Sequence, residues 1–243
     1  MQDLKRLLDD EIAIRNNTSE ISEEKPDPLL VARKYNDEYI SFICAMFSYG
    51  NASLIVKFLS KLDFSLLESS SENILNNDLG YYRFQSKQDV LEFFVTMSKF
   101  KKLYSLEKIF LEGFSKNQAI IDGIRNIITV IYDINPYRSK GYEFLIGKAN
   151  SKGAYKRYNM YLRWMVRDDF IDLGLWKSVD KENLIIPLDT HTFRIAKNLG
   201  LIKRKTYDYK SAIELTNTLK KFDEFDPVKY DFVMYRLGQE KKL

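Results

Sequence analysis

The chain has few of the residues that build disulfides and metal centres. Its 243 residues include one cysteine, Cys44, and one histidine, His191. A single cysteine excludes a disulfide within the chain and the four thiolates of an iron–sulfur cluster, and one Cys with one His is too few for a zinc site. Cys44 lies in the apolar run 43–47, where we expect it to pack as a small hydrophobic residue. The sequence therefore predicts no metal site.

Long apolar runs and strand patterns are also scarce. No apolar run is long enough to span a bilayer, and the first six residues lack the apolar segment of a secretion signal, so we expect a cytoplasmic protein that does not enter a membrane. Only residues 184–188 read as extended, whereas apolar residues recur at helical spacing along most of the chain. The predicted fold class is all-α. The length fits one large domain or two small lobes that share a cleft.

Charge is distributed unevenly along the chain. The formal net charge is only +4. Residues 1–28 carry eight acids and four bases, a net of 4 − 8 = −4, whereas residues 135–168 carry eight bases and two acids, a net of 8 − 2 = +6. A solvated helix face is the ordinary explanation of such a basic stretch, and a nucleic-acid contact is the alternative.

Capping residues divide the chain into helices. Asp or Ser precedes many of the apolar-periodic segments, as expected of helix N-caps. The segment 37–49 is apolar nearly all round, so we expect it at the buried centre of the amino-terminal lobe. Residues 63–84 read as irregular and 16–25 as a polar loop. The predicted helices span residues 1–15, 28–34, 37–49, a segment ending near 62, 86–101, 105–114, 119–132, about 154–167, 190–199, 208–220 and 227–237.

The helix that begins near Ala154 has two predicted faces. Its core-facing stripe consists of Tyr158, Tyr161, Leu162 and Met165. Positions spaced at i, i+4, i+7 and i+11 fall on the opposite side, and these are Lys156, Met160, Arg163 and Arg167. We therefore expect Lys156 to point away from the core.

The segment 187–201 predicts a fixed carboxylate at the start of a helix. Asp189 precedes apolar positions at helical spacing and is expected to accept a hydrogen bond from an early amide as the N-cap. Gly200 suits the left-handed residue that ends such a helix. Asp189 would then be held at the positive end of the helix dipole, and on this pattern alone it could be a cap and nothing more.

These two segments together resemble a known family. Pro187-Leu188-Asp189-Thr190-His191, followed by Phe-Arg-Ile-Ala and Leu-Gly-Leu, resembles the segment that bears the catalytic aspartate in the helix-hairpin-helix DNA glycosylases. The upstream segment 147–157 is similar to that family's glycine-bearing hairpin, and Lys156 matches the position of the nucleophile. The separation of 189 − 156 = 33 residues resembles the archaeal 8-oxoguanine DNA glycosylase branch (AGOG).

The resemblance, which covers about residues 141–201, implies a fold and an activity. It implies a two-lobed helical glycosylase with its helix-hairpin-helix at about 141–167, its catalytic-aspartate segment at 184–201 and its active site in the cleft between the lobes. The implied enzyme flips 8-oxoguanine out of double-stranded DNA, excises it and nicks the strand as a DNA glycosylase and AP lyase, without metal or cofactor. We expect a monomer with no protein partner, associated with the nucleoid if the source is prokaryotic.

The resemblance also assigns roles to residues of this chain. Lys156 would form a Schiff base with the sugar, and Asp189 would stabilise the positive charge that develops there. Whether Asp189 also helps to remove a proton from Lys156 stays open. The expected DNA contacts are Lys148, Lys152, Gly153, Arg157 and His191. Trp164 and Trp176 could stack on the flipped base, or they could belong to the core.

Three alternatives remain open from the sequence. The same fold could excise another base, such as an alkylated purine or an oxidised pyrimidine. The chain could also be a non-catalytic helical module whose hairpin grips the DNA backbone. Lys156 could accordingly be a phosphate-contacting surface lysine rather than a nucleophile.

Overall fold

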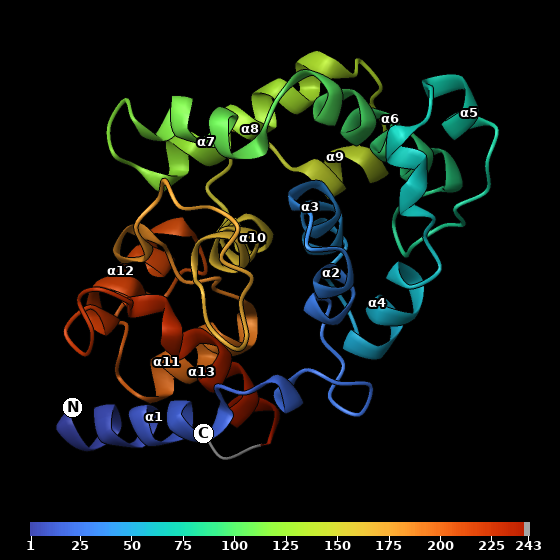
Figure 1. Ribbon diagram of the computed structural model, residues 1–243. Helices are drawn as coiled ribbons and strands as arrows, with labels where there is room; N and C mark the ends of the chain where they lie inside the picture. The colour runs from blue at the N-terminus through green and yellow to red at the C-terminus, as the bar shows by residue number, and fades with distance from the viewer. Residues whose placement is uncertain (241–243) are drawn as a thin grey trace. The chain divides into compact units, whose positions relative to one another are not determined.

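A computed structural model of the protein describes residues 1–240, whose regular elements are all helices, with no strand (Figure 1). The all-α prediction is therefore confirmed for the part of the chain that the structure describes. Its helices are α1 (Gln2–Arg15), α2 (Leu29–Tyr35), α3 (Glu38–Met46), α4 (Ala52–Leu59), α5 (Ser71–Leu75), α6 (Lys87–Leu103), α7 (Leu106–Phe114), α8 (Ile120–Ile134), α9 (Lys140–Ile146), α10 (Lys156–Val166), α11 (Thr190–Asn198), α12 (Tyr209–Leu219) and α13 (Tyr230–Gln239), with short 3-10 helices at Thr18–Glu20, Phe64–Glu68, Lys181–Asn183 and Pro227–Lys229.

The chain divides into two compact units. Unit 1 consists of Met1–Lys25 and Lys152–Leu243, and unit 2 consists of Pro26–Ser151. The first 25 residues thus belong with the carboxyl-terminal half. The boundary between Ser151 and Lys152 falls inside the connection from α9 to α10, which is the segment predicted as the hairpin.

Unit 2 is organised by helices whose starts are capped as the sequence predicts. The Asp37 carboxylate accepts hydrogen bonds from the amides of Tyr39 (2.8 Å) and Ile40 (2.9 Å). Every residue of α3 from Tyr39 onward is buried, which confirms the prediction of a central helix, although the helix ends at Met46 rather than at residue 49. Ser86 and Asp89 form a reciprocal capping box at the start of α6. Such caps each stabilise a helix by about 1 kcal/mol.

The prediction of an irregular segment at 63–84 is wrong in part. This segment contains the 3-10 helix Phe64–Glu68 and the helix α5. Asp63 and Ser70 cap the two elements through hydrogen bonds to the amides of Ser65 and Asn73. Both elements bury apolar side chains, among them Leu67 and Ile74, and this burial stabilises elements too short to be recognised from periodicity.

Unit 1 brings the two ends of the described chain together. Helix α1 packs against α13 (Figure 1). The Arg15 guanidinium donates two hydrogen bonds of 2.8 Å to the two carboxylate oxygens of Glu240, and the Tyr230 hydroxyl donates to Asp9 (2.9 Å). This docking explains why residues 1–25 belong to unit 1, because paired charges and a buried Arg15 fix the helix to the end of the chain.

Candidate functional site

Lys156 is the first residue of α10, directly after a strained backbone position. Tyr155 caps this helix with φ +50, a left-handed conformation that costs a non-glycine residue on the order of 1 kcal/mol. The Tyr155 ring is held edge-on against the rings of Tyr158 and Tyr209, at centroid distances of 6.3 and 5.9 Å. The Lys156 Nζ donates to the Met160 Sδ at 3.6 Å. The start of α10 is therefore fixed by packing, and Lys156 is half-buried on it.

The connection that precedes α10 carries the predicted DNA contacts. Lys148, Lys152 and Gly153 are exposed, and Arg157 is half-buried in the first turn of α10. Lys148 belongs to unit 2, and the other three residues belong to unit 1. Within unit 1 the carbonyl of Lys152 accepts a hydrogen bond from the amide of Tyr209 (3.1 Å), which anchors the chain just before α10.

Asp189 is the N-cap of α11, as predicted. Its Oδ1 accepts a hydrogen bond from the amide of Thr192 at 2.7 Å. The preceding Leu188 is buried, and its carbonyl accepts a hydrogen bond from the Tyr207 hydroxyl (3.0 Å). At the other end of the helix Gly200 has φ +68, which confirms the predicted left-handed ending. The carboxylate is half-buried and locked in place, whereas His191 in the same first turn is exposed.

A third charged residue, Asp231 on α13, is influenced electrostatically by both Lys156 and Asp189. Burial raises the pKa of the Asp231 carboxyl to about 6, the positive charges of Arg163 and Lys156 act to lower it, and the negative charge of Asp189 acts to raise it. The amine and the carboxylate that the sequence singled out therefore both lie within electrostatic range of one buried acid in unit 1. Sequence reasoning missed Asp231, and its signal was an acidic residue among apolar neighbours in the last helix.

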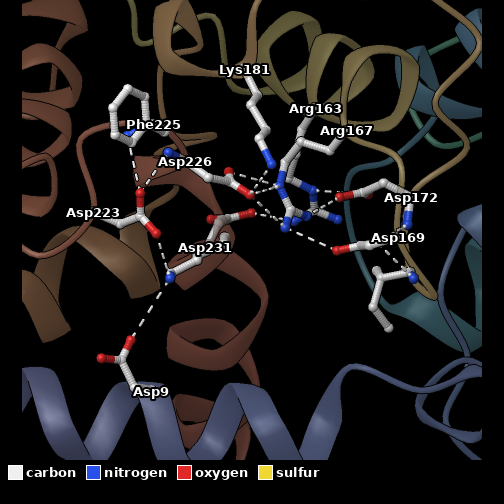
Figure 2. A network of polar contacts seen from close by, with 12 residues as sticks. Asp9, Arg163, Arg167, Asp169, Asp172, Lys181, Asp223, Phe225, Asp226 and Asp231 are labelled. Carbon is white, nitrogen blue, oxygen red and sulfur yellow. Dashed lines mark hydrogen bonds and ion pairs between the residues drawn. The ribbon is translucent and has the colours of Figure 1, made fainter.

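Asp231 belongs to a buried network of charges beside α10 (Figure 2). Arg163 donates through Nη1 to Asp231 and through Nε to the Asp172 Oδ1 at 3.2 Å. Arg167 donates through Nε to the Asp226 Oδ1 at 3.0 Å. It also pairs with Asp172 and, at 2.9 Å, with Asp169. We call the two arginines and these four aspartates the arginine–aspartate network.

The network corrects the prediction made for the second face of α10. Met160, Arg163 and Arg167 are buried, so this side of the helix does not face solvent. The helix lies inside unit 1, and the two guanidiniums are buried because aspartates from other parts of the chain neutralise them. Two of the eight bases in the basic stretch 135–168 are thus internal and unavailable to an anionic ligand.

Both tryptophans lie in the core of unit 1. Trp164 has no exposed surface, and Trp176 is 2% exposed. The Trp176 ring packs edge-on against Tyr161 with centroids 5.5 Å apart, and its amide donates to the carbonyl of Met165 (2.7 Å). Neither indole presents a free face, so of the two roles open for Trp164 and Trp176 this arrangement favours the core and not the stacking of a base.

Unit 2 contains an exposed feature that the sequence did not predict, a group of three rings and one guanidinium. Phe84 and Phe144 are 58% and 46% exposed, with ring centroids 4.9 Å apart, and Phe84 lies nearly parallel to Tyr49. The Arg83 guanidinium lies 5.4 Å from the centre of the Phe84 ring and 5.7 Å from that of Tyr49. We call Tyr49, Arg83, Phe84 and Phe144 the aromatic cluster. Arginine stacked on exposed rings is a surface suited to planar, electron-rich ligands.

Other features of the described chain lie away from these residues. A hollow of about 460 Å³ on α12 is lined by side chains that include Arg204, Lys210 and Lys221, and by none of the predicted site residues. Within residues 1–240, no group of three or more His, Cys, Asp or Glu side chains is arranged to hold a metal ion. None of the helices described has both the length and the apolar content needed to cross a membrane.

Comparison with known proteins gives one match. A family model described as "Protein of unknown function (DUF2400)" matches residues 27–240, which is most of the chain. No curated protein and no solved structure matches it.

Proposed function

The chain belongs to the DUF2400 family, and we propose that it is a bifunctional DNA glycosylase and AP lyase that excises 8-oxoguanine from double-stranded DNA. The observation that carries the proposal is the placement of Lys156 and Asp189 in one compact unit, both acting on the buried Asp231. An amine and a fixed carboxylate are the two groups that this chemistry requires. The resemblance of the Pro187–Leu201 and Gly147–Arg157 segments to the helix-hairpin-helix glycosylases supplies the reaction and the substrate.

The first proposed step is displacement of the base by Lys156. The neutral amine attacks the anomeric carbon of a flipped-out nucleotide while the bond from that carbon to the base breaks, and the base leaves with the bonding electrons and a proton. Positive charge develops on the sugar during this step. The Asp189 carboxylate stabilises it, because the cap hydrogen bond and buried Leu188 hold the carboxylate in one position.

The second proposed step cuts the strand. The amine remains bonded to the sugar carbon, the ring opens and a Schiff base forms, which acidifies the proton on the adjacent carbon. Loss of that proton then expels the 3′ phosphate by β-elimination, and hydrolysis of the Schiff base releases Lys156. Every atom in this sequence comes from the DNA, water and the side chain, so the proposal needs no added oxidant or reductant.

The proposed DNA contacts divide between backbone and bases. Lys148, Lys152, Gly153, Arg157 and His191 lie on exposed or half-buried positions that suit the phosphate backbone, where cations and backbone amides position DNA without reading its sequence. The aromatic cluster suits a base, because every nucleobase has a flat face that stacks on aromatic rings and guanidinium groups. We therefore place a base contact on unit 2 in addition to the backbone contacts.

The proposal is tested by borohydride trapping on a duplex that contains one 8-oxoguanine. We expect the wild-type protein to give a covalent protein–DNA adduct and Lys156→Gln to give none, with Lys177→Gln, a substitution of an exposed lysine, trapping like the wild type. Asp189→Asn is a matched probe because asparagine caps a helix as well as aspartate does. It should fold normally and lose about 100-fold or more in the rate of base release.

The outcomes separate the alternatives. An intact wild-type protein that gives no adduct on 8-oxoguanine but traps on a duplex with another damaged base changes the substrate and keeps the enzyme. Binding to DNA without an adduct on any lesion would show a non-catalytic module and overturn the proposal.

A further inference from the structure

The arginine–aspartate network contains more negative than positive groups. Its two guanidiniums face four carboxyls, and the exposed Lys181 lies 3.7 Å from Asp226. Asp169, Asp172 and Asp226 all pair with Arg167, and Asp172 also pairs with Arg163. A buried group of this composition favours retaining a proton on one carboxyl, because uncompensated charge is costly away from water.

Asp231 is the member of the network on which Lys156 and Asp189 both act electrostatically. Arg163, which pairs with it, stands seven positions after Lys156 on α10, which is two helical turns along the same face. Its own helix, α13, packs against α11, whose N-cap is Asp189. An amine, a capping carboxylate and a buried acid thus come from α10, the start of α11 and α13, all in unit 1.

We propose that Asp231 is a positioning residue that takes up the proton which Lys156 must lose before it attacks the sugar. The proton moves from the ammonium of Lys156 to the carboxylate of Asp231, which leaves a neutral amine and a neutral carboxyl. Burial makes this possible, because it disfavours two separated charges relative to two neutral groups. The inference rests on the proposed function, since it assumes that Lys156 is the nucleophile.

The groups around Asp231 give this proton transfer a defined pH dependence. Lys156 and Arg163 act on it from α10, and Asp189 acts on it from the N-cap of α11. The α1 residues Asp9 and Arg15 instead pair with Tyr230 and with Glu240, which follows α13. The pKa of Asp231 is raised to about 6 by burial, with Asp189 adding to the rise and the two cations opposing it. Only the ionised carboxylate can accept a proton, so the proposed transfer fails as the pH falls through about 6.

The test is the pH profile of a single-turnover reaction with a duplex that carries a preformed abasic site. The rate of adduct formation is measured between about pH 5 and pH 9 for the wild type, Asp231→Asn, Asp231→Glu and Asp226→Asn. The wild-type rate should fall on the acid side near pH 6. Asp231→Asn should not show this fall in rate, which we call the acid limb of the profile. At neutral pH it should react at least about tenfold more slowly than the wild type, and its rate should recover at alkaline pH, where Lys156 loses its proton to the solvent.

The other two variants are controls. Asp231→Glu restores a carboxyl and should restore the acid limb. Asp226→Asn removes a carboxyl from the Arg167 end of the same network, so it should keep the wild-type profile. A loss of packing alone would lower all rates without moving the limb.

Each outcome decides the inference. A folded Asp231→Asn protein whose rate has the wild-type pH profile overturns it. A wild-type protein whose rate does not fall near pH 6 also overturns it. The wild-type profile is the deciding measurement if the variant does not fold. A wild-type protein that forms no adduct at any pH overturns the proposed function instead. An adduct that depends on Lys156 but not on Asp231 overturns the inference alone.

Discussion

Replacing Asp231 by asparagine should stabilise the protein at neutral and alkaline pH. The pKa of the Asp231 carboxyl in the folded protein is about 6, against an ordinary value of 3.8, with burial as the main cause. A difference of about 2 pH units corresponds to about 3 kcal/mol between the ionised and the protonated forms. Above pH 6 the folded protein therefore carries a cost of up to about 3 kcal/mol for keeping this acid ionised. Asparagine has the shape of the protonated acid and avoids that cost.

The pH dependence of this gain has a definite sign. Between about pH 4 and pH 6 the folded protein binds more protons at Asp231 than the unfolded chain does, so this residue makes stability fall as the pH rises through that range. The difference in unfolding free energy between Asp231→Asn and the wild type should thus be largest at about pH 8. It should shrink as the pH falls through 6, because the wild-type residue then becomes neutral as well.

Urea unfolding of both proteins at about pH 8 and about pH 5 measures this difference. The comparison between two variants at one pH cancels the other titrating groups, provided that both unfold with the same slope. A variant that is less stable than the wild type by the same amount at both pH values would refute the reasoning. That result would mean that pairing with Arg163 stabilises the ionised carboxyl by more than burial disfavours it.

Two further predictions concern the network and the aromatic cluster. Arg167→Met leaves the buried Asp172 and Asp226 and the half-buried Asp169 short of their shared cation. It should lower the free energy of unfolding by about 3–5 kcal/mol at neutral pH and by less in acid, where the aspartates gain protons. Urea unfolding at the two pH values checks this, and an equal loss at both would contradict it. Phe84→Ala should weaken binding to an abasic-site duplex by about tenfold, measured by fluorescence anisotropy. Phe225→Ala, at a ring that is 69% exposed against 58% for Phe84, should not weaken it. Equal affinities would remove the aromatic cluster from the DNA contact.

The sequence predicts the local parts of the fold because they depend on neighbouring residues. Asp37, Ser86, Asp189 and Asp208 each precede an apolar-periodic segment, and in the structure each side chain accepts a hydrogen bond from an amide two or three residues later. A cap needs nothing beyond its own first turn, so its signal survives in a single sequence. The left-handed ending at Gly200 is predictable for the same reason.

The environment of α10 could not be predicted in this way. The partners of Arg163 and Arg167 include Asp231 and Asp226, which lie 68 and 59 residues later in the chain. A periodic pattern of bases on a helix is the same whether the face meets water or buried aspartates. The docking of α1 on α13 is a similar case, since it joins Arg15 with Glu240 across 225 residues.

The presence of a buried ionisable group at position 231 is consistent with the proposed function. Arg163 already pairs with Asp172, so its charge is compensated without a second carboxylate. Burial makes the ionised form of Asp231 costly, and Lys156 is an amine whose charge acts on this acid. Groups with shifted pKa values gather where proton transfer is needed, and a site of this kind is often less stable than an inert version of itself. A stability gain and a loss of the acid limb in the same Asp231→Asn protein would be the joint signature of that trade-off.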